Sequence, residues 1–288
     1  MACRRVRHSC TCNPARVIVY ESRVSNGATT IITVGAFVLV LVTAFACTRP
    51  PRVMRPPAPI APTPALMPIG RTVESVVSDI GPRVRARLAP YFERAGVAYP
   101  PSAVAFLAFK DERRLEIWAR TDDESGAAGM WMQIDARPIL AASGESGPKL
   151  RQGDRQVPEG LYRLVLFNPN SRYHLSMKLD YPNAFDLAAA AVDGRTELGG
   201  DIFIHGDDRS IGCIAMGDPG IEDLFVLVAD VGLERARMIV APRDPRAGGR
   251  LVAAPGLPFT VELYRQIEVD LAAFSLGPCL PEQGPAGP

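Results

Sequence analysis

The chain has 288 residues, which is enough for one good-sized domain or two small ones. Hydrophobic residues make up 47% of it, so part of the chain can form a substantial core. The formal net charge is only +1, with neither the basic excess that would indicate nucleic-acid binding nor an acidic tail that would indicate a basic partner.

The first apolar run covers residues 27–47, which is about the length that spans a bilayer. It has no polar face, so a membrane segment explains it better than a buried core helix does. Arginines lie on both sides, and the positive-inside rule favours a cytoplasmic N-terminus with the rest of the chain outside. We therefore expect residues 1–48 to be a signal or membrane-anchor segment. Ala46-Cys47 resembles a lipoprotein cleavage site, while an uncleaved signal anchor and a cleaved secretory signal stay open as alternatives.

Proline dominates the next stretch, and residues 49–70 are predicted to be an extended linker. Residues 71–100 are predicted to be a helical spacer, because apolar residues recur there at helical spacing: Val73, Val76, Val77, Ile80, Val84 and Leu88. This helix either packs against the body that follows or lengthens the spacer.

From Val104 the apolar pattern changes to the alternation that is typical of strands. A hairpin is predicted from residues 104–109 and 115–119, joined by a charged turn. Further strands are predicted at residues 130–134, 161–167, 173–179, 201–204 and 237–241. The body over residues 101–245 is therefore expected to be mainly β.

Two helices are predicted toward the C-terminus. The first is expected to have Asp218 as its cap, Pro219 at its first position and Gly232 at its end. The second is expected over residues 261–274, with a disordered tail after it in the segment 246–288. With these flanking helices the overall class is α+β.

The cysteines differ sharply in their surroundings. Three of them precede the apolar run and superficially resemble metal ligands, together with a nearby histidine: Cys3, Cys10, Cys12 and His8. A second ligand pair is missing, so we predict no metal site there. Cys47 belongs to the targeting segment, and Cys279 lies in a terminal stretch rich in proline and glycine. Cys213 is the only cysteine in the predicted folded body. A lone thiol in an exported protein is either buried and inert or reactive.

A base for that thiol lies close by in the sequence. His205 follows the strand predicted at 201–204, and Cys213 comes eight residues later. The thiolate is the attacking species, and an imidazole is the usual group that generates it. We expect the Gly206 carbonyl to orient the imidazole, and the amides around Gly212 and Cys213 to form an oxyanion hole. The alternative is a structural cysteine near a loop histidine.

Three blocks of the sequence resemble one enzyme family. The segment 204–218, IHGDDRSIGCIAMGD, resembles the active-site signature of the YkuD-type L,D-transpeptidase domain, in the short form typical of its YafK-like branch. The segment 143–162 contains GPKLRQGDRQVPEGLY, and the segment 168–183 begins NPNSRYHLS, which are similar to two further blocks of that branch. The resemblance extends over about residues 104–241 and implies a YkuD-like β-sandwich or barrel.

The resemblance also implies roles for individual residues. Cys213 matches the acylated nucleophile, His205 the general base, and Gly206 the residue whose carbonyl orients that base. Ser210 and Gly212 match the S-x-G-C turn, where Ser210 is expected to form the turn rather than to carry a proton. Other residues are substrate-binding candidates by motif membership only, with ordinary surface or strand roles as the alternative: Lys149, Arg151, Asp154, Arg172 and Tyr173.

The function implied is a two-step acyl transfer on peptidoglycan stem peptides at diaminopimelate, at the outer side of the cytoplasmic membrane and without a metal or organic cofactor. The chain departs from the wider family where Ile211 and Ala215 replace a histidine and an arginine, which leaves the acyl acceptor open. The alternatives are a hydrolase that cleaves crosslinks or releases wall-anchored lipoprotein, a cysteine peptidase of another specificity, and a non-catalytic wall-binding module.

Overall fold

The computed structural model describes residues 70–122 and 126–274 of the chain. The predicted anchor segment, most of the Pro-rich linker and the predicted disordered tail lie outside these residues. The described part contains four α-helices and two short 3₁₀ helices: α1 (Val73–Ala95), α2 (Ala184–Asp193), α3 (Gly217–Val231), η1 (Leu233–Arg235), η2 (Pro245–Ala247) and α4 (Phe259–Leu271).

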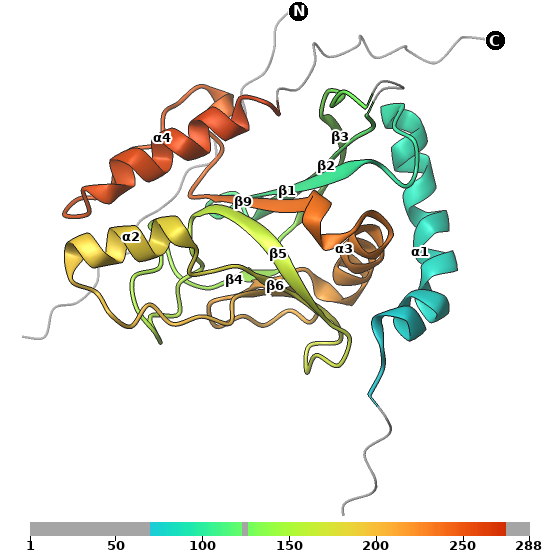
Figure 1. The fold of residues 1–288 in the computed structure, drawn as a ribbon, viewed down its shortest axis with the longest axis horizontal. Helices are drawn as coiled ribbons and strands as arrows, with labels where there is room; N and C mark the ends of the chain where they lie inside the picture. Colours follow the sequence, from blue (N-terminus) through green and yellow to red (C-terminus); the bar gives the residue numbers. More distant parts are fainter. Residues whose placement is uncertain (1–69, 123–125, 275–288) are drawn as a thin grey trace, which may run out of the picture. The chain divides into compact units, whose positions relative to one another are not determined.

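Nine strands form one mixed sheet in the order β3-β2-β1-β9-β5-β6-β7-β8-β4. Neighbouring strands are antiparallel except for β1 with β9 and β7 with β8, which are parallel. The sheet curls into a half-barrel (Figure 1). Its strands are β1 (Ala103–Phe109), β2 (Arg114–Arg120), β3 (Met132–Pro138), β4 (Ala141–Ala142), β5 (Gly160–Asn168), β6 (Ser176–Leu179), β7 (Phe203–His205), β8 (Ile214–Ala215) and β9 (Ala236–Ala241).

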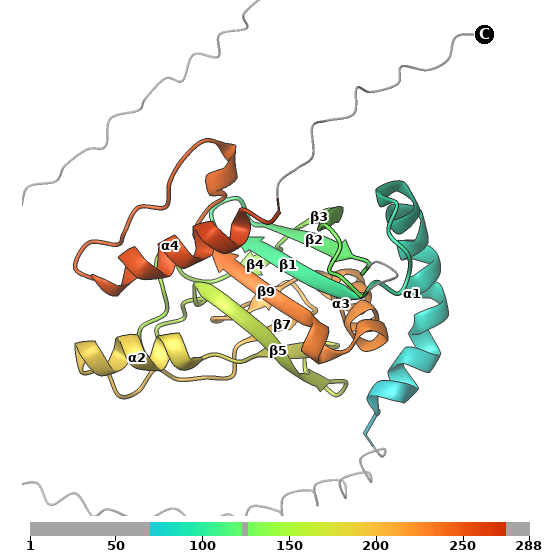
Figure 2. The same cartoon turned by 45° about the horizontal axis from the view of Figure 1, so that its top comes forward.

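Strand β1 shows how the layers are arranged, because it is covered on both faces. Val104, Phe106 and Ala108 belong to a core shared with α1 and α3. The alternate residues of β1 belong to a second core, which α4 closes with Leu263, Ile267 and Leu271. Both views show α1 and α3 together on one side and α4 on the other (Figures 1 and 2). The period of two along β1 therefore places its side chains in two separate cores.

Helix α1 packs against the body. Thr72 caps it through a reciprocal pair of hydrogen bonds with Ser75, and Gly96 ends it in the left-handed conformation. Its apolar stripe lies fully inside the first core: Val76, Ile80, Val84, Leu88 and Phe92. Three of its arginines form ion pairs with carboxylates of α3: Arg83 and Arg87 with Glu222, Arg87 with Asp223, and Arg85 with Asp230. Packing against the body is thus the alternative that the structure supports.

The α+β class is confirmed, but the expectation of a mainly β body is too strong. The helices contribute more residues than the strands, and α2 was not among the predicted elements. Asn183 caps α2 through a capping box with Asp186. This pair, followed by an alanine-rich stretch, is a sequence signal for a helix start. The β part is one bent sheet, so a two-sheet sandwich does not describe it.

Several predicted boundaries need correction. The strand predicted at 130–134 is Met132–Pro138, and the one predicted at 173–179 is only Ser176–Leu179, because a tight turn at His174 (φ 68°) precedes it. Asp218 does not cap α3. The helix starts at Gly217, two residues before the predicted first position Pro219, and the Asp218 carboxylate instead accepts a hydrogen bond from the amide of Asp207 at 2.9 Å. The hairpin and the strands around residues 161–167 and 237–241 are confirmed.

Within the described ranges, no helix combines the length and the apolar character needed to cross a membrane. The apolar run at 27–47 lies outside these ranges, so the anchor stays a prediction.

If α1 is part of the folded body, Leu88→Ala should lower the free energy of unfolding by about 2–5 kcal/mol, because Leu88 is fully buried between α1 and the core. Urea denaturation of the full chain measures this. Glu93→Ala, on the exposed side of the same helix, is the matched control and should change stability by less than about 0.5 kcal/mol. Equal effects of the two substitutions would show that α1 is a detached spacer.

Candidate active site

The candidate site is built on two short parallel strands. His205 is the last residue of β7, and it pairs with Ala215 of β8, while Ile204 pairs with Ile214. Cys213 immediately precedes β8, two residues before Ala215. Side chains two apart along a strand point to the same face, and paired residues of parallel strands do so as well. The register therefore directs the side chains of His205 and Cys213 to one face of the sheet.

The imidazole of His205 is almost fully buried, with 2% of the residue exposed. Its Nδ1 lies 2.5 Å from the carbonyl oxygen of Gly206. A carbonyl only accepts, so Nδ1 carries the proton and Nε2 has a free lone pair. The ring of Tyr173 stacks on the imidazole, with centroids 4.6 Å apart and planes at 29°. Burial lowers the pKa of His205, against smaller opposing effects of the Gly206 carbonyl and Asp207. The neutral imidazole is therefore favoured near neutral pH.

Gly206 is required by close packing. A Cβ at this position would lie 2.6 Å from the Asp218 carboxylate and 2.7 Å from the carbonyl oxygen of Tyr173. Because the second of these is backbone, no side chain can be accommodated without moving the chain. The same tight contact fixes the direction of the Gly206 carbonyl that orients His205. The Gly206 carbonyl thus lies against the His205 ring, while the catalytic role of Gly206 stays a prediction.

The Cys213 thiol is half-buried, and its Sγ donates to the carbonyl oxygen of Asp201 at 3.8 Å. Burial raises the pKa of the Cys213 thiol, against a smaller lowering effect of the Phe203 amide. The group is therefore a neutral thiol near neutral pH. Among the residues that the structure describes, no hydrogen bond joins this thiol to the His205 ring. The two groups thus lie on one face of adjoining strands as separate neutral partners.

The turn before Cys213 is stabilised by two hydroxyl groups. Ser210 Oγ accepts from the Cys213 amide at 3.0 Å and donates to the Cys213 carbonyl, as expected of a turn-forming serine. The Gly212 amide donates to Ser143 Oγ. Gly212 has φ 103°, which few residues other than glycine adopt. Both amides that we expected to form an oxyanion hole are therefore occupied, and each becomes available only when its serine hydroxyl moves away.

Lys149 and Asp154 form an internal pair. Lys149 Nζ contacts Asp154 Oδ1 at 2.5 Å and donates to the Arg151 carbonyl, while the other Asp154 oxygen accepts the amides of Leu150 and Arg151. These contacts shape the loop that faces the Gly212 turn. Lys149 is close enough for its charge to lower the pKa of Cys213, although burial of the thiol outweighs this effect. Both residues thus have satisfied structural partners.

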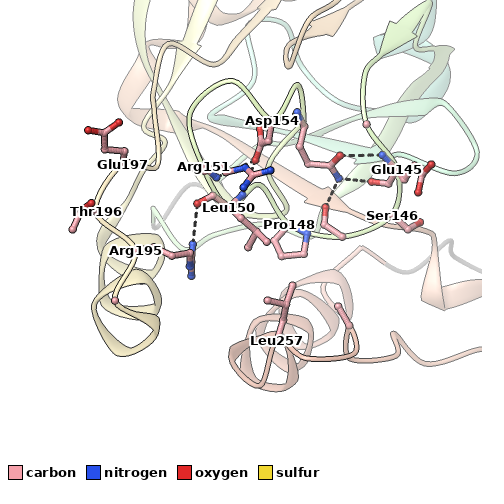
Figure 3. A pocket seen from close by; sticks show the side chains of 15 residues that line it. Glu145, Ser146, Pro148, Leu150, Arg151, Asp154, Arg195, Thr196, Glu197 and Leu257 are labelled. Carbon is pink, nitrogen blue, oxygen red and sulfur yellow. Dashed lines mark hydrogen bonds between the residues drawn. The ribbon is translucent and has the colours of Figure 1, made fainter. Parts of the chain in front are cut away.

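The remaining candidates lie in two different cavities. Arg151 lines a cavity of about 930 Å³ between the loop 144–156, the end of α2 and the segment before α4, together with Arg195, Glu197 and Leu257 (Figure 3). Arg172 lines a shallower cavity of about 530 Å³ with Tyr173. Cys213 lines neither of them. The structure therefore brings Tyr173 to the catalytic candidates but leaves Arg151 and Arg172 apart from each other.

Sequence reasoning missed three residues around the site. Ser143 holds the Gly212 amide, the Asp201 carbonyl accepts the thiol, and Asp218 fixes the backbone at Asp207. Ser143 and Asp218 lie at the ends of the conspicuous sequence blocks, which was the available signal. Within the described residues, no cluster of three or more His, Cys, Asp or Glu side chains is arranged to hold a metal ion.

The site combines an oriented imidazole with a thiol on the adjoining segment, and comparison with known proteins shows which family it resembles. Residues 110–243 match the family model of the L,D-transpeptidase catalytic domain, YkuD. The resemblance that the sequence blocks predict is thus confirmed over this part of the chain.

The relatives are similar over part of their length. The Escherichia coli (strain K12) protein named "Putative L,D-transpeptidase YafK" is 36% identical over 129 residues, which cover 44% of this chain. The chain spans about half the length (48%) of this curated relative. Among solved structures, the helical cell shape determining protein Pgp2 from Campylobacter jejuni is 23% identical over 54% of this chain and 55% of that chain, with a TM-score of 0.39. Bd1075 from Bdellovibrio bacteriovorus is 20% identical over 62% of this chain and 57% of its own, with a TM-score of 0.34.

The raised pKa of Cys213 predicts the pH dependence of its alkylation. Iodoacetamide should modify the native chain with a midpoint above the ordinary cysteine value of about 8.5, since the thiolate is the reacting form. The other five cysteines require that the peptide carrying Cys213 be followed by mass spectrometry, with the urea-denatured chain as reference.

His205→Gln is the control for this titration. Because both groups are neutral in the resting site, this substitution should leave the alkylation midpoint within about half a unit of wild type. A native midpoint below 8.5 that rises in His205→Gln would show a preformed thiolate–imidazolium pair instead.

Proposed function

We propose that the chain is a peptidoglycan-modifying enzyme of the L,D-transpeptidase type, which forms a cysteinyl acyl-enzyme with stem peptides at diaminopimelate. The observation that carries the proposal is the buried imidazole of His205, oriented by the Gly206 carbonyl, on the strand beside the half-buried thiol of Cys213. The family match and the similarity to YafK support the reaction class. The substrate follows from the same family resemblance.

The chemistry begins from a neutral pair. The Cys213 sulfur attacks the peptide carbonyl carbon as its proton passes to His205 Nε2, and the C–N bond breaks when His205 returns the proton to the leaving amine. An incoming amine or water then gives its proton to His205 and attacks the thioester, the C–S bond breaks, and His205 returns the proton to the Cys213 sulfur. A lowered imidazole pKa favours the free base at the start of each step. Substrate binding is expected to bring the two groups into contact, as happens in many such sites.

Acyl transfer and hydrolysis share every step up to the thioester. An amine prevails over water only if the enzyme holds it beside the thioester. Ile211 is 75% exposed at the turn before Cys213, whereas Ala215 is buried in β8. The side chains of both residues are apolar, so neither can form a hydrogen bond with the amine that would accept the acyl group. We therefore keep hydrolysis, including the release of wall-anchored lipoprotein, as the second candidate function.

The location is part of the proposal. An enzyme acting on stem peptides must work at the outer side of the cytoplasmic membrane, where the predicted anchor at 27–47 would place the domain. A wall-binding module without activity is disfavoured, because such a module needs neither the oriented imidazole nor the thiol.

Cys213→Ala and His205→Gln should each lower the turnover of purified sacculi by the full-length chain, the first to background and the second by about 10²–10⁴-fold. Product analysis by liquid chromatography and mass spectrometry measures this. Cys279→Ala and His8→Gln are the matched controls, with the same chemical changes outside the proposed site, and should retain activity. Near-wild-type turnover by Cys213→Ala would contradict the mechanism.

The acceptor is decided by a competition experiment. Tetrapeptide muropeptides are incubated with the enzyme with and without a D-amino acid as the amine. Because Ile211 supplies no polar side chain for the acceptor, we expect Ile211→His to raise the ratio of exchanged to hydrolysed product by roughly threefold or more. Ile211→Val is the control, since it retains an apolar side chain. Shortened peptides alone, in every variant and at every amine concentration, would identify the enzyme as a hydrolase.

A further inference from the structure

A tight turn at His174 lies directly against the catalytic candidates. The Leu175 amide donates to the Tyr173 carbonyl at 2.9 Å, and His174 between them has φ 68°. This is a γ-turn in its rare form with positive φ, a conformation that is strained for a residue with a Cβ. Such a turn persists only when its surroundings hold it.

Two contacts hold this turn from outside. Arg71, in the segment leading into α1, donates from Nη2 to the His174 carbonyl at 2.9 Å, and its own backbone exchanges two hydrogen bonds with the Asn170 side chain. On the other side, His174 Nε2 lies 3.1 Å from Glu222 Oε1 of α3. The same carboxylate pairs with Arg83 of α1 at 2.8 Å. His174 is thus held between Arg71, just before α1, and Glu222 of α3.

The turn in its clamped form determines the surroundings of the imidazole. It places the Tyr173 ring on the His205 ring, and it places the Tyr173 carbonyl against Gly206, whose own carbonyl orients His205. The Leu175 carbonyl also accepts the Gly206 amide at 3.1 Å. One strained turn therefore touches both the ring of the base and the backbone that orients the ring.

We propose that His174, held by Arg71 and Glu222, is a positioning residue for His205. Its strained turn keeps Tyr173 stacked on the imidazole. Because Arg71 holds this turn, the segment before α1 contributes to the geometry of the active site. The kinetic consequence rests on the proposed function, whereas the effect on the imidazole itself does not.

The strained φ provides a pair of variants that separates positioning from general stability. His174→Ala loses the contact with Glu222 and still has a Cβ that disfavours positive φ, so the turn should relax and release Tyr173. His174→Gly loses the same contact but adopts positive φ freely, so the turn should persist. A purely structural role predicts that glycine is no better than alanine.

The readout is the titration of the His205 ring, followed by NMR on the full-length chain. Only His8 and His205 remain in the His174 variants, and His205→Gln identifies the signal. Loss of the Tyr173 cover hydrates the ring, so the midpoint in His174→Ala should rise by roughly half a unit or more, and His174→Gly should stay near wild type. Asp207 is the charged neighbour that acts on this ring, and it is unchanged in both variants.

Turnover of sacculi gives the second readout. A rise of half a unit should lower kcat/KM of His174→Ala by roughly threefold relative to wild type on the acid limb and less above it, with His174→Gly restoring the profile. If wild type turns over no sacculi, the proposed function fails while the titration still tests the positioning. Equal midpoints in wild type and His174→Ala, or equal shifts in the alanine and glycine variants, would overturn the inference.

Two further sets of variants serve as an independent test and as a control. Arg71→Ala leaves His174 in place and should shift the His205 midpoint in the same direction, and Arg71→Lys should restore it, because lysine can also donate to the His174 carbonyl. Arg113 has φ 47° in the turn between β1 and β2, so Arg113→Ala and Arg113→Gly form the backbone-matched control. Those two substitutions should leave the His205 midpoint unchanged, and a shift in either would contradict the specificity of the His174 turn.

Discussion

The site depends on how few residues connect two parallel strands. Parallel neighbours usually need a crossover of a dozen or more residues, whereas only residues 206–213 join β7 to β8. So short a return requires positive φ at Asp207 and Gly212, and it places polar backbone groups where no regular partner exists. Asp218, Ser210 and Ser143 supply those partners. The register of the two strands that this connection joins places the thiol and the imidazole on the same face.

The electrostatics of the site follow from burial and from a backbone carbonyl. The group that orients the imidazole is a backbone carbonyl rather than a carboxylate, and the charge of Asp207 has only a minor effect on the ring. A carbonyl fixes the tautomer without adding a full negative charge, so burial controls the protonation state of the base. The thiol is likewise governed by burial, because the nearby ammonium of Lys149 is already paired with Asp154. The resting site therefore holds two neutral groups, and charge develops only during reaction.

Parts of this arrangement could be predicted from sequence and parts could not. Elimination among the cysteines and histidines of the body leads to Cys213 and His205, and the alternation of apolar residues gives the hairpin and β9. The strand predicted at 173–179 failed because the positive φ at His174 depends on distant contacts from Arg71 and Glu222, which no local pattern encodes. The occupied amides at the turn were missed for the same reason, since Ser143 lies 69 positions from the glycine it contacts.

The region matched by the family, residues 110–243, begins one residue after β1 ends and stops before α4. Yet β1 lies between β2 and β9 in the sheet, and the Tyr264 hydroxyl of α4 donates to the buried Glu159 carboxylate, which also contacts Lys110. A fragment cut at the matched ends would expose two unpaired strand edges and the apolar face that α4 covers, both of which favour aggregation. The unit that can be inherited, shuffled or expressed as a soluble fragment must therefore extend beyond the family signature on both sides.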